Sequence, residues 1–263
     1  MASEDDSALK AVRQLFGKEG KTTAEDLGGY LDPSDVDSWA IDVDNIESFS
    51  LDEDLRQGRI GNCWFLASLA SIADSNPDAI EERITLVKGD SPDQDYWEVE
   101  LWNGSEWVTH QVTQDEIVEG GVRDAHGNIT WMTIYERAAV EHMGGEFGNI
   151  ERNVAGKGFD MVAGDNGALS LNLDIDIIEE KLDSGQSVVT STPPGIPLLG
   201  PADDVVPGHV YVVDEIVHPA DGSEPRIRLI NPWGDVSSDK PQVLELTQSE
   251  YTRSFISYNY LGD

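Results

Sequence analysis

Cysteine is nearly absent from this chain of 263 residues, because Cys63 is the only one. A single cysteine excludes an internal disulfide framework. Long apolar runs are missing too, since no stretch of about 18 apolar residues is available to span a membrane. Residues 1–7 lack the basic and apolar regions of a secretory signal peptide. We therefore expect a cytoplasmic protein with no membrane partner.

Basic residues are also scarce: 17 Lys and Arg stand against 51 Asp and Glu, for a formal net charge of −34. A nucleic acid would meet net repulsion, so we do not expect one as a partner. Disorder fits poorly, because 39% of the residues are hydrophobic and seven are tryptophan. We expect a folded, halophilic protein working in concentrated salt, where the Debye length falls to about 3 Å at 1 M. Stability and activity should then rise with KCl toward molar concentrations.

The cysteine lies at the start of an apolar segment. Residues 63–73 contain two serines and no other polar side chain before Asp74. Asn62 is a good N-cap residue, so we predict a buried helix that begins at Cys63 and is capped by the Asn62 side-chain oxygen. The positive end of the helix dipole would lower the thiol pKa and favour the reactive thiolate. On position alone, a small buried hydrophobe is an equally good interpretation of Cys63.

Hydrophobic periodicity predicts helices in the first part of the chain and strands in the second. Residues 96–102 and 107–112 alternate around Asn103-Gly104, which indicates a β-hairpin, and residues 131–143 read as a helix. Two short helices are expected before the cysteine, at residues 7–16 and 23–31. After Asn166 we predict strands at residues 187–190, 209–213, 226–230, 242–246 and 256–260.

This division predicts an α+β protein with three parts. Residues 1–45 form a partly helical N-terminal arm, residues 46–166 a helical lobe that carries the cysteine, and residues 167–263 a β-rich lobe.

A cysteine nucleophile needs a base, a group that orients the base, and donors for the oxyanion. His209 stands at the start of a buried strand, and Asn231 follows the next strand. If those strands pair, the Asn231 amide oxygen accepts from one imidazole nitrogen and leaves the other facing the sulfur. Taken alone, a histidine at a strand end is more often structural, and Asn-Pro-Trp-Gly is an ordinary turn.

The conjunction of motifs resembles the protease core of the calpain family over about residues 45 to 260. The motifs are Gln57-Gly-x-x-Gly-Asn-Cys63-Trp-Phe-Leu-Ala, Trp131-Met-Thr-Ile-Tyr-Glu-Arg-Ala138, Gly208-His209-x-Tyr-x-Val and Asn231-Pro-Trp-Gly234. The resemblance implies a papain-like fold with two lobes, one helical and one β-rich, and an active site between them.

The resemblance also implies roles. Cys63 would be the nucleophile, His209 the general base and then acid, and Asn231 the group that orients it. Gln57 would donate its side-chain amide to the oxyanion alongside the Cys63 backbone N–H. Trp233 would shield the bond between His209 and Asn231.

By the same resemblance, Trp64 and Gly208, the neighbours of nucleophile and base, belong to the substrate cleft.

Calcium-dependent activation is a further implication, and here the chain departs from the family. Asp54 matches one acidic calcium ligand, but Ile129 and Thr130 stand where an acid is expected before Trp131. The loop after Gly234 is also shorter than in the family. We therefore expect no required cofactor, with calcium as an alternative and Asp54 as its candidate ligand.

The predicted activity is that of a thiol endopeptidase that makes limited cuts in polypeptides through an acyl-enzyme thioester. Two alternatives stay open. One is another papain-like thiol hydrolase or acyl transferase, such as a leader peptidase or a transglutaminase. The other is a non-catalytic module that binds peptide in the cleft. No feature of the sequence indicates an oligomeric state.

Overall fold

The computed structural model describes residues 22–36, 39, 41, 43, 46–195, 201–234 and 240–262. The helix expected at residues 7–16 lies outside these residues. The helix expected at residues 23–31 is wrong, because the chain forms turns there. Gly28 and Gly29 have φ angles of 97° and 95°, which a right-handed helix does not allow.

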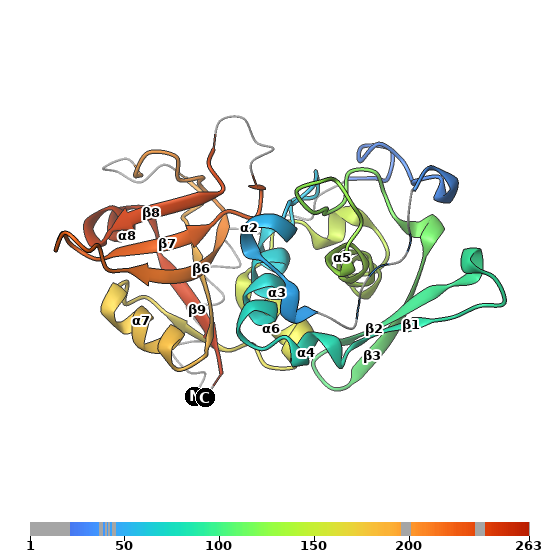
Figure 1. The fold of residues 1–263 in the computed structure, drawn as a ribbon, viewed down its shortest axis with the longest axis horizontal. Helices are drawn as coiled ribbons and strands as arrows, with labels where there is room; N and C mark the ends of the chain where they lie inside the picture. Colours follow the sequence, from blue (N-terminus) through green and yellow to red (C-terminus); the bar gives the residue numbers. More distant parts are fainter. Residues whose placement is uncertain are drawn as a thin grey trace.

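A six-stranded antiparallel sheet occupies one end of the molecule and a three-stranded antiparallel sheet the other, with helices between them (Figure 1). The strands of the larger sheet lie in the order β4-β9-β5-β6-β7-β8. They are β4 (Ala168–Ser170), β5 (Ser187–Ser191), β6 (Val210–Val217), β7 (Arg226–Ile230), β8 (Val243–Thr247) and β9 (Ser257–Leu261). The smaller sheet contains β1 (Ile84–Val87), β2 (Tyr96–Trp102) and β3 (Trp107–Thr113).

Seven α-helices and five short 3₁₀ helices are present among the described residues. The α-helices are α2 (Leu51–Asp54), α3 (Cys63–Ser75), α4 (Asp78–Glu81), α5 (Trp131–His142), α6 (Ala155–Ala163), α7 (Ile175–Asp183) and α8 (Gln248–Ser254). The 3₁₀ helices are η1 (Pro33–Asp35), η2 (Ile46–Ser48), η3 (Pro92–Gln94), η4 (Gln114–Glu116) and η5 (Phe147–Ile150). Within this described part of the chain, none of the helices has the length and apolar character needed to cross a membrane.

Helix α3 is buried on all sides, as its sequence predicts. Every residue from Trp64 to Ala73 is buried. The two serines satisfy their hydroxyls inside the protein: Ser68 Oγ donates to the carbonyls of Trp64 and Ala155, and Ser71 Oγ to that of Val188. The helix can therefore pass through the interior without unpaired polar groups on its side chains.

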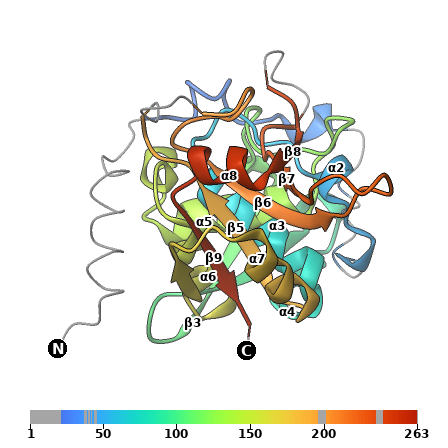
Figure 2. The same cartoon turned by 90° about the vertical axis from the view of Figure 1, so that its left-hand side faces the viewer.

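Alternate side chains of the central strands point to opposite faces of the larger sheet, and each face packs in a different hydrophobic cluster. Val210 and Val212 of β6 belong to the cluster around α3, whereas Tyr211 and Val213 belong to a second cluster with α7 and α8. Figure 2 shows α7 and α8 on the near side of this sheet and α3 behind it. Because β6 is covered on both faces, the residue directly before it is held in a rigid, buried setting.

Most predicted elements are confirmed to within one or two residues, but several were missed. The hairpin, the helix from residue 131 and the five later strands all form; β6 starts at Val210 and runs on to Val217. Helices α6, α7 and α8 and strands β1 and β4 were not predicted. The helix α6 contains two glycines, whose low helix propensity hides it. Strand β4 has only three residues, too few for a periodicity to register.

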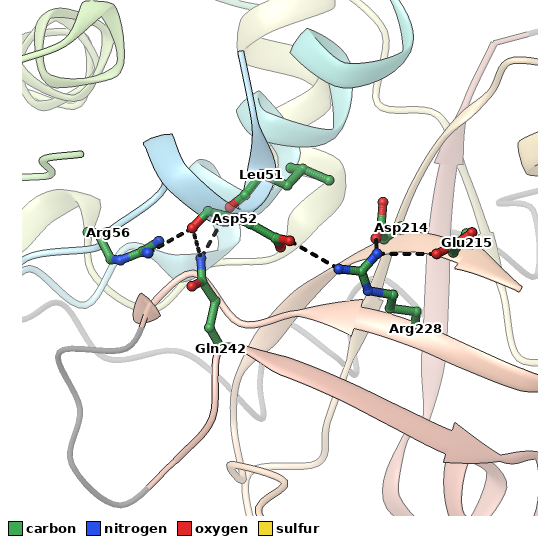
Figure 3. A network of polar contacts seen from close by, with 7 residues as sticks. All are labelled: Leu51, Asp52, Arg56, Asp214, Glu215, Arg228 and Gln242. Carbon is green, nitrogen blue, oxygen red and sulfur yellow. Dashed lines mark hydrogen bonds and ion pairs between the residues drawn. The ribbon is translucent and has the colours of Figure 1, made fainter. Parts of the chain in front are cut away.

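A polar network joins α2 to the larger sheet (Figure 3). The Arg228 guanidinium on β7 lies 3.0 Å from an Asp52 carboxylate oxygen of α2. On the other side it pairs with Asp214 at 3.0 Å and Glu215 at 3.2 Å. Gln242 Nε2 donates to the backbone carbonyl of Asp52 at 3.0 Å. These contacts hold α2 against the larger sheet. Helix α2 precedes residues 55–62, the cysteine loop, which lead to Cys63, and strand β7 of the sheet is followed directly by Asn231.

Candidate active site

Cys63 is the first residue of α3 and packs, half-buried, against the cluster that contains Val210. Burial raises the pKa of its thiol to about 11, while backbone hydrogen bonds from Val210, Trp64 and Cys63 itself act in the opposite direction. The predicted lowering of the pKa is therefore wrong. The desolvation of a thiolate outweighs the N–H groups at the helix start.

The predicted side-chain cap by Asn62 is also wrong. Asn62 does occupy the N-cap position, but its side chain makes no capping hydrogen bond. Its Nδ2 donates instead to Glu136 Oε1 at 2.7 Å, inside the protein. The carbonyl of Asn62 accepts the first helical bonds, from the N–H groups of Phe65 at 2.9 Å and Leu66 at 3.1 Å.

His209 lies immediately before β6, and its backbone is fixed by Thr192. The His209 N–H donates to Thr192 Oγ1, and the Thr192 N–H donates to the His209 carbonyl, both at 2.9 Å. Gly208 before it has φ +64°, a left-handed conformation that suits glycine, and its N–H donates to Pro193 at 2.7 Å. The turn therefore sets the direction in which the imidazole enters the interior.

The structure brings His209 and Asn231 together. Strands β6 and β7 pair as an antiparallel hairpin, with Val212 opposite Ile230, which places Asn231 beside the start of β6. His209 Nε2 lies 2.8 Å from Asn231 Oδ1. Because that amide oxygen only accepts, Nε2 must donate, so Nδ1 is the unprotonated nitrogen of the neutral ring. Burial lowers the pKa of His209 to about 4, and the bond to Asn231 acts against this shift.

Two aromatic rings enclose this imidazole. The Trp233 and Tyr211 ring centroids each lie 4.9 Å from that of His209. The backbone N–H of Trp233 also donates to Asn231 Oδ1, at 3.1 Å. Asn231 is completely buried, and its own N–H donates to Gln242 at 2.7 Å. Water is thus kept away from the histidine–asparagine bond, which strengthens that bond.

Gln57 connects the cysteine loop to the same turn. Its backbone N–H donates to the carbonyl of Pro232 at 2.7 Å, between Asn231 and Trp233. Its side chain is buried; Nε2 donates to Ile60, and Oε1 has no partner among the described residues. One of the two amide hydrogens is therefore engaged within the loop.

Comparison with known proteins shows the family of this chain. A model of the calpain family cysteine proteases matches residues 32–241. The chain belongs to the calpain family. It is 27% identical to calpain-8 of Rattus norvegicus over 206 residues, and 28% identical to the calpain-2 catalytic subunit of Mus musculus over 209 residues. Each alignment covers 70% of this chain but only 28% of the relative.

The position of Trp64 differs from the expectation that the family motif raised. Its side chain is completely buried, and its indole N–H donates to the carbonyl of Ile150 at 2.7 Å. It therefore anchors α3 to the core instead of lining a substrate cleft. Trp233, by contrast, is half-buried over the imidazole.

The calcium ligands of calpains do not assemble around Asp54. Its carboxylate accepts from the Ser50 N–H at 2.7 Å, at the start of α2. Burial raises the Asp54 pKa, and the neighbouring carboxylate of Asp124 acts in the same direction. Asp124 is itself occupied by the N–H groups of His126 and Asn128. Within the described ranges, no group of three acidic, His or Cys side chains converges on a metal position.

Sequence reasoning missed Glu136 of α5, which binds Asn62 at the start of the cysteine helix. The signal was available, because Glu136 lies one helical turn from both Met132 and Val140 and so shares their buried face. It also missed the contact between His110 and His142, whose ring nitrogens are 2.9 Å apart. These two residues meet only because β3 packs on α5, which no local pattern records.

Proposed function

We propose that this protein is a cysteine endopeptidase that hydrolyses peptide bonds in polypeptides. In this mechanism Cys63 is the nucleophile, His209 the general base and then acid, Asn231 the orienting group, and Gln57 a donor to the oxyanion. The helical residues 46–166 and the β-rich residues 167–263 act as the two lobes of a papain-like protease, with polypeptide bound between them.

The hydrogen bond between His209 and Asn231 is the observation that carries the proposal. An exposed histidine needs no buried amide partner, whereas this one is enclosed by two aromatic rings with one nitrogen already donating. A base held in one tautomer, with its second nitrogen free, is the arrangement that activates a neighbouring thiol. A backbone hydrogen bond from Val210, the residue after His209, lowers the pKa of the Cys63 thiol, which indicates that the start of β6 and the start of α3 lie close together.

The pKa values of about 11 for Cys63 and about 4 for His209 imply an uncharged thiol and imidazole at neutral pH. Peptide binding would start the reaction: the Sγ proton moves to His209 Nδ1 as Sγ attacks the peptide carbonyl. The oxyanion accepts from the Cys63 N–H and the Gln57 amide. The imidazolium then gives its proton to the leaving amine, and water, deprotonated by His209, hydrolyses the thioester and releases the acid.

The net negative charge of the protein suggests the salt concentration at which it works. With a net charge of −34, the protein would gain stability and activity as KCl screens its surface carboxylates. We place it in the cytoplasm of a cell with concentrated internal salt. No calcium requirement is expected, because Asp54 and Asp124 are committed to local hydrogen bonds. The calpain relatives are more than three times as long as the aligned part, so their regulation and partners are not carried over.

Cleavage of an unfolded polypeptide in molar KCl tests this function. Wild type should produce new peptide ends, with and without a calcium chelator, and Cys63→Ala should produce none. Asn231→Ala should lower kcat by about 10²-fold or more, because the imidazole loses its tautomer and orientation. The matched control is His218→Ala, since His218 is an exposed histidine that pairs with Glu179 on the surface.

The outcomes separate the alternatives. Full activity in Asn231→Ala would remove the basis of the proposed mechanism. Reaction of the thiol with acyl donors, without cleavage of any polypeptide, would point to a thiol hydrolase or acyl transferase with another substrate. Peptide binding without any reaction would leave a non-catalytic module. A loss of cleavage on chelation would restore calcium as a requirement.

A further inference from the structure

Glu136 is a buried carboxylate that the proposed chemistry does not use. It lies on α5 with 3% of its surface exposed. Its Oε1 accepts from Asn62 Nδ2 at 2.7 Å, and its Oε2 accepts from the Val122 N–H at 2.9 Å. Burial raises its pKa, and these two bonds together with the Arg123 charge oppose the shift. A carboxylate without water needs such donors, and both of them come from the loops around the cysteine.

The bond has a visible effect on Asn62. Asparagine at an N-cap usually bonds the second or third helical N–H, but Asn62 makes no such bond, and its Oδ1 has no partner among the described residues. Its backbone, with φ −112° and ψ 27°, also differs from the extended conformation of a capping residue. Glu136 therefore holds the amide away from the helix, at the cost of an unpaired acceptor.

The start of α3 is left open as a result. The N–H groups of Phe65 and Leu66 donate to the Asn62 carbonyl. Those of Cys63 and Trp64 have no oxygen acceptor in the described part of the chain, and both lower the pKa of the Cys63 thiol. An Asn62 side chain in the capping position would take the Trp64 or Phe65 N–H and would place an amide oxygen beside the sulfur.

The loop around this contact has little freedom to adjust. Gly58 has no room for a side chain, because an added Cβ would overlap the carbonyl oxygens of Gly120 and Gly121. The Arg59 N–H donates to Gly120 at 2.7 Å. The cysteine loop and the turn at residues 118–123 are thus packed backbone to backbone, and Glu136 binds one residue from each.

We propose that Glu136 is a positioning residue of the active site: by binding the Asn62 side chain it keeps that side chain off the start of α3, so that the backbone N–H groups beside Cys63 remain free for the thiolate and the oxyanion. This inference rests on the proposed function. In the usual capping position, the Asn62 side chain would occupy N–H groups beside Cys63 and so inhibit the enzyme.

Two substitutions of Glu136 separate the hydrogen bond from the charge. Glu136→Gln removes the charge and can still hold the Asn62 side chain: the new amide accepts from the Val122 N–H with its oxygen and, once the Asn62 amide group turns over, donates to Asn62 Oδ1 with its nitrogen. Glu136→Met keeps the volume but releases Asn62. The double variant Glu136→Met/Asn62→Ala also lacks the bond but has no side chain that could cap the helix. Glu141→Met, on the exposed side of the same helix, is the matched control.

The measurement is the rate of Cys63 alkylation by iodoacetamide as a function of pH, which is specific because the chain has no other thiol. We expect Glu136→Met to shift the profile to higher pH and to slow alkylation at pH 7 by about 5- to 30-fold, the factor of one capping bond. Glu136→Gln should resemble wild type. The double variant should recover the alkylation rate although it remains less stable to urea than wild type, a combination that a merely structural role does not produce.

Peptide cleavage is measured on the same variants to separate the two claims. The inference is overturned if wild type cleaves peptide but the double variant reacts as slowly as Glu136→Met, or if Glu136→Met matches Glu141→Met. Failure of wild type to cleave any polypeptide would instead count against the proposed function, and the alkylation series would still report on Asn62.

Discussion

Replacing Arg228 with methionine should destabilise the protein strongly in dilute salt and weakly in concentrated salt. Arg228 is the cation between Asp52 of α2 and the pair Asp214 and Glu215 of β6 (Figure 3). Exposed ion pairs contribute about 0 to 1 kcal/mol, whereas breaking a buried pair costs about 3 to 5. The Arg228 side chain is 26% exposed and meets three carboxylates at 3.0 to 3.2 Å. We therefore expect a loss of about 2 kcal/mol near 0.15 M KCl.

Salt should reduce this loss because its origin is repulsion among three carboxylates left without their cation. The Debye length falls from about 8 Å at 0.15 M to about 3 Å at 1 M, which is no longer than the contacts themselves. Urea denaturation of wild type and Arg228→Met across a KCl series measures the difference in the free energy of unfolding. Arg226→Met is the control, since Arg226 lies on the same strand and forms no ion pair within 4 Å among the described residues; it donates to the Glu245 backbone carbonyl at 3.5 Å.

Acid should reduce the loss as well. Burial raises the pKa of Asp214 to about 6, so the folded protein favours its neutral form. The stability contributed by this carboxyl is present below its ordinary pKa near 3.8 and is lost as the pH rises through 6. Repulsion around position 228 is therefore weaker at pH 5 than at pH 7.5. A cost for Arg228→Met that is absent in dilute salt, or that grows with KCl, would refute the electrostatic argument.

Three further predictions concern other described residues. Burial lowers the pKa of His142 to about 4, so its neutral form stabilises the fold above pH 6.5 and this stability is lost as the pH falls toward 4. In urea titrations, His142→Asn should flatten this part of the pH dependence of the free energy of unfolding. Trp233→Ala should admit water to His209, raise its pKa toward 6.5 and move the acidic limb of the kcat/KM profile upward; an unmoved limb would show that the indole does not shield the ring. Gly58→Ala should abolish the soluble fold, whereas Gly61→Ala, whose nearest contact would be an ordinary 3.6 Å, should keep a near-native melting temperature; equal melting temperatures would contradict the packing.

The sequence predicted those features that depend on local pattern. Alternation placed β2, and the apolar run after Cys63 placed α3, because burial of one face or of a whole helix leaves a recognisable pattern of apolar residues in the sequence. The pairing of His209 with Asn231 also followed, since two strands joined in sequence usually lie side by side.

The two errors at the start of α3 have a different cause, which is competition from groups far away in the chain. Asn62 has an intrinsic preference to cap α3, but Glu136, 74 positions later, offers a charged acceptor that local reasoning does not see. In the same way, the pKa of Cys63 follows the helix dipole only if the thiol is hydrated, and packing against β6 removes that water. Local sequence therefore indicated that His209 and Asn231 lie side by side, whereas the protonation states of Cys63 and His209 and the partner of the Asn62 side chain depend on tertiary packing.

Intact-protein mass spectrometry after reaction with a peptidyl fluoromethyl ketone tests the central claim most directly. This reagent needs peptide binding and an activated thiol together, and the protein offers Cys63 as its sole cysteine. The account predicts a single adduct on wild type in molar KCl at neutral pH, an unchanged yield in His218→Ala, and almost none in His209→Ala. Equal labelling of wild type and His209→Ala would contradict the account, because Cys63 would then be an ordinary thiol that His209 does not activate.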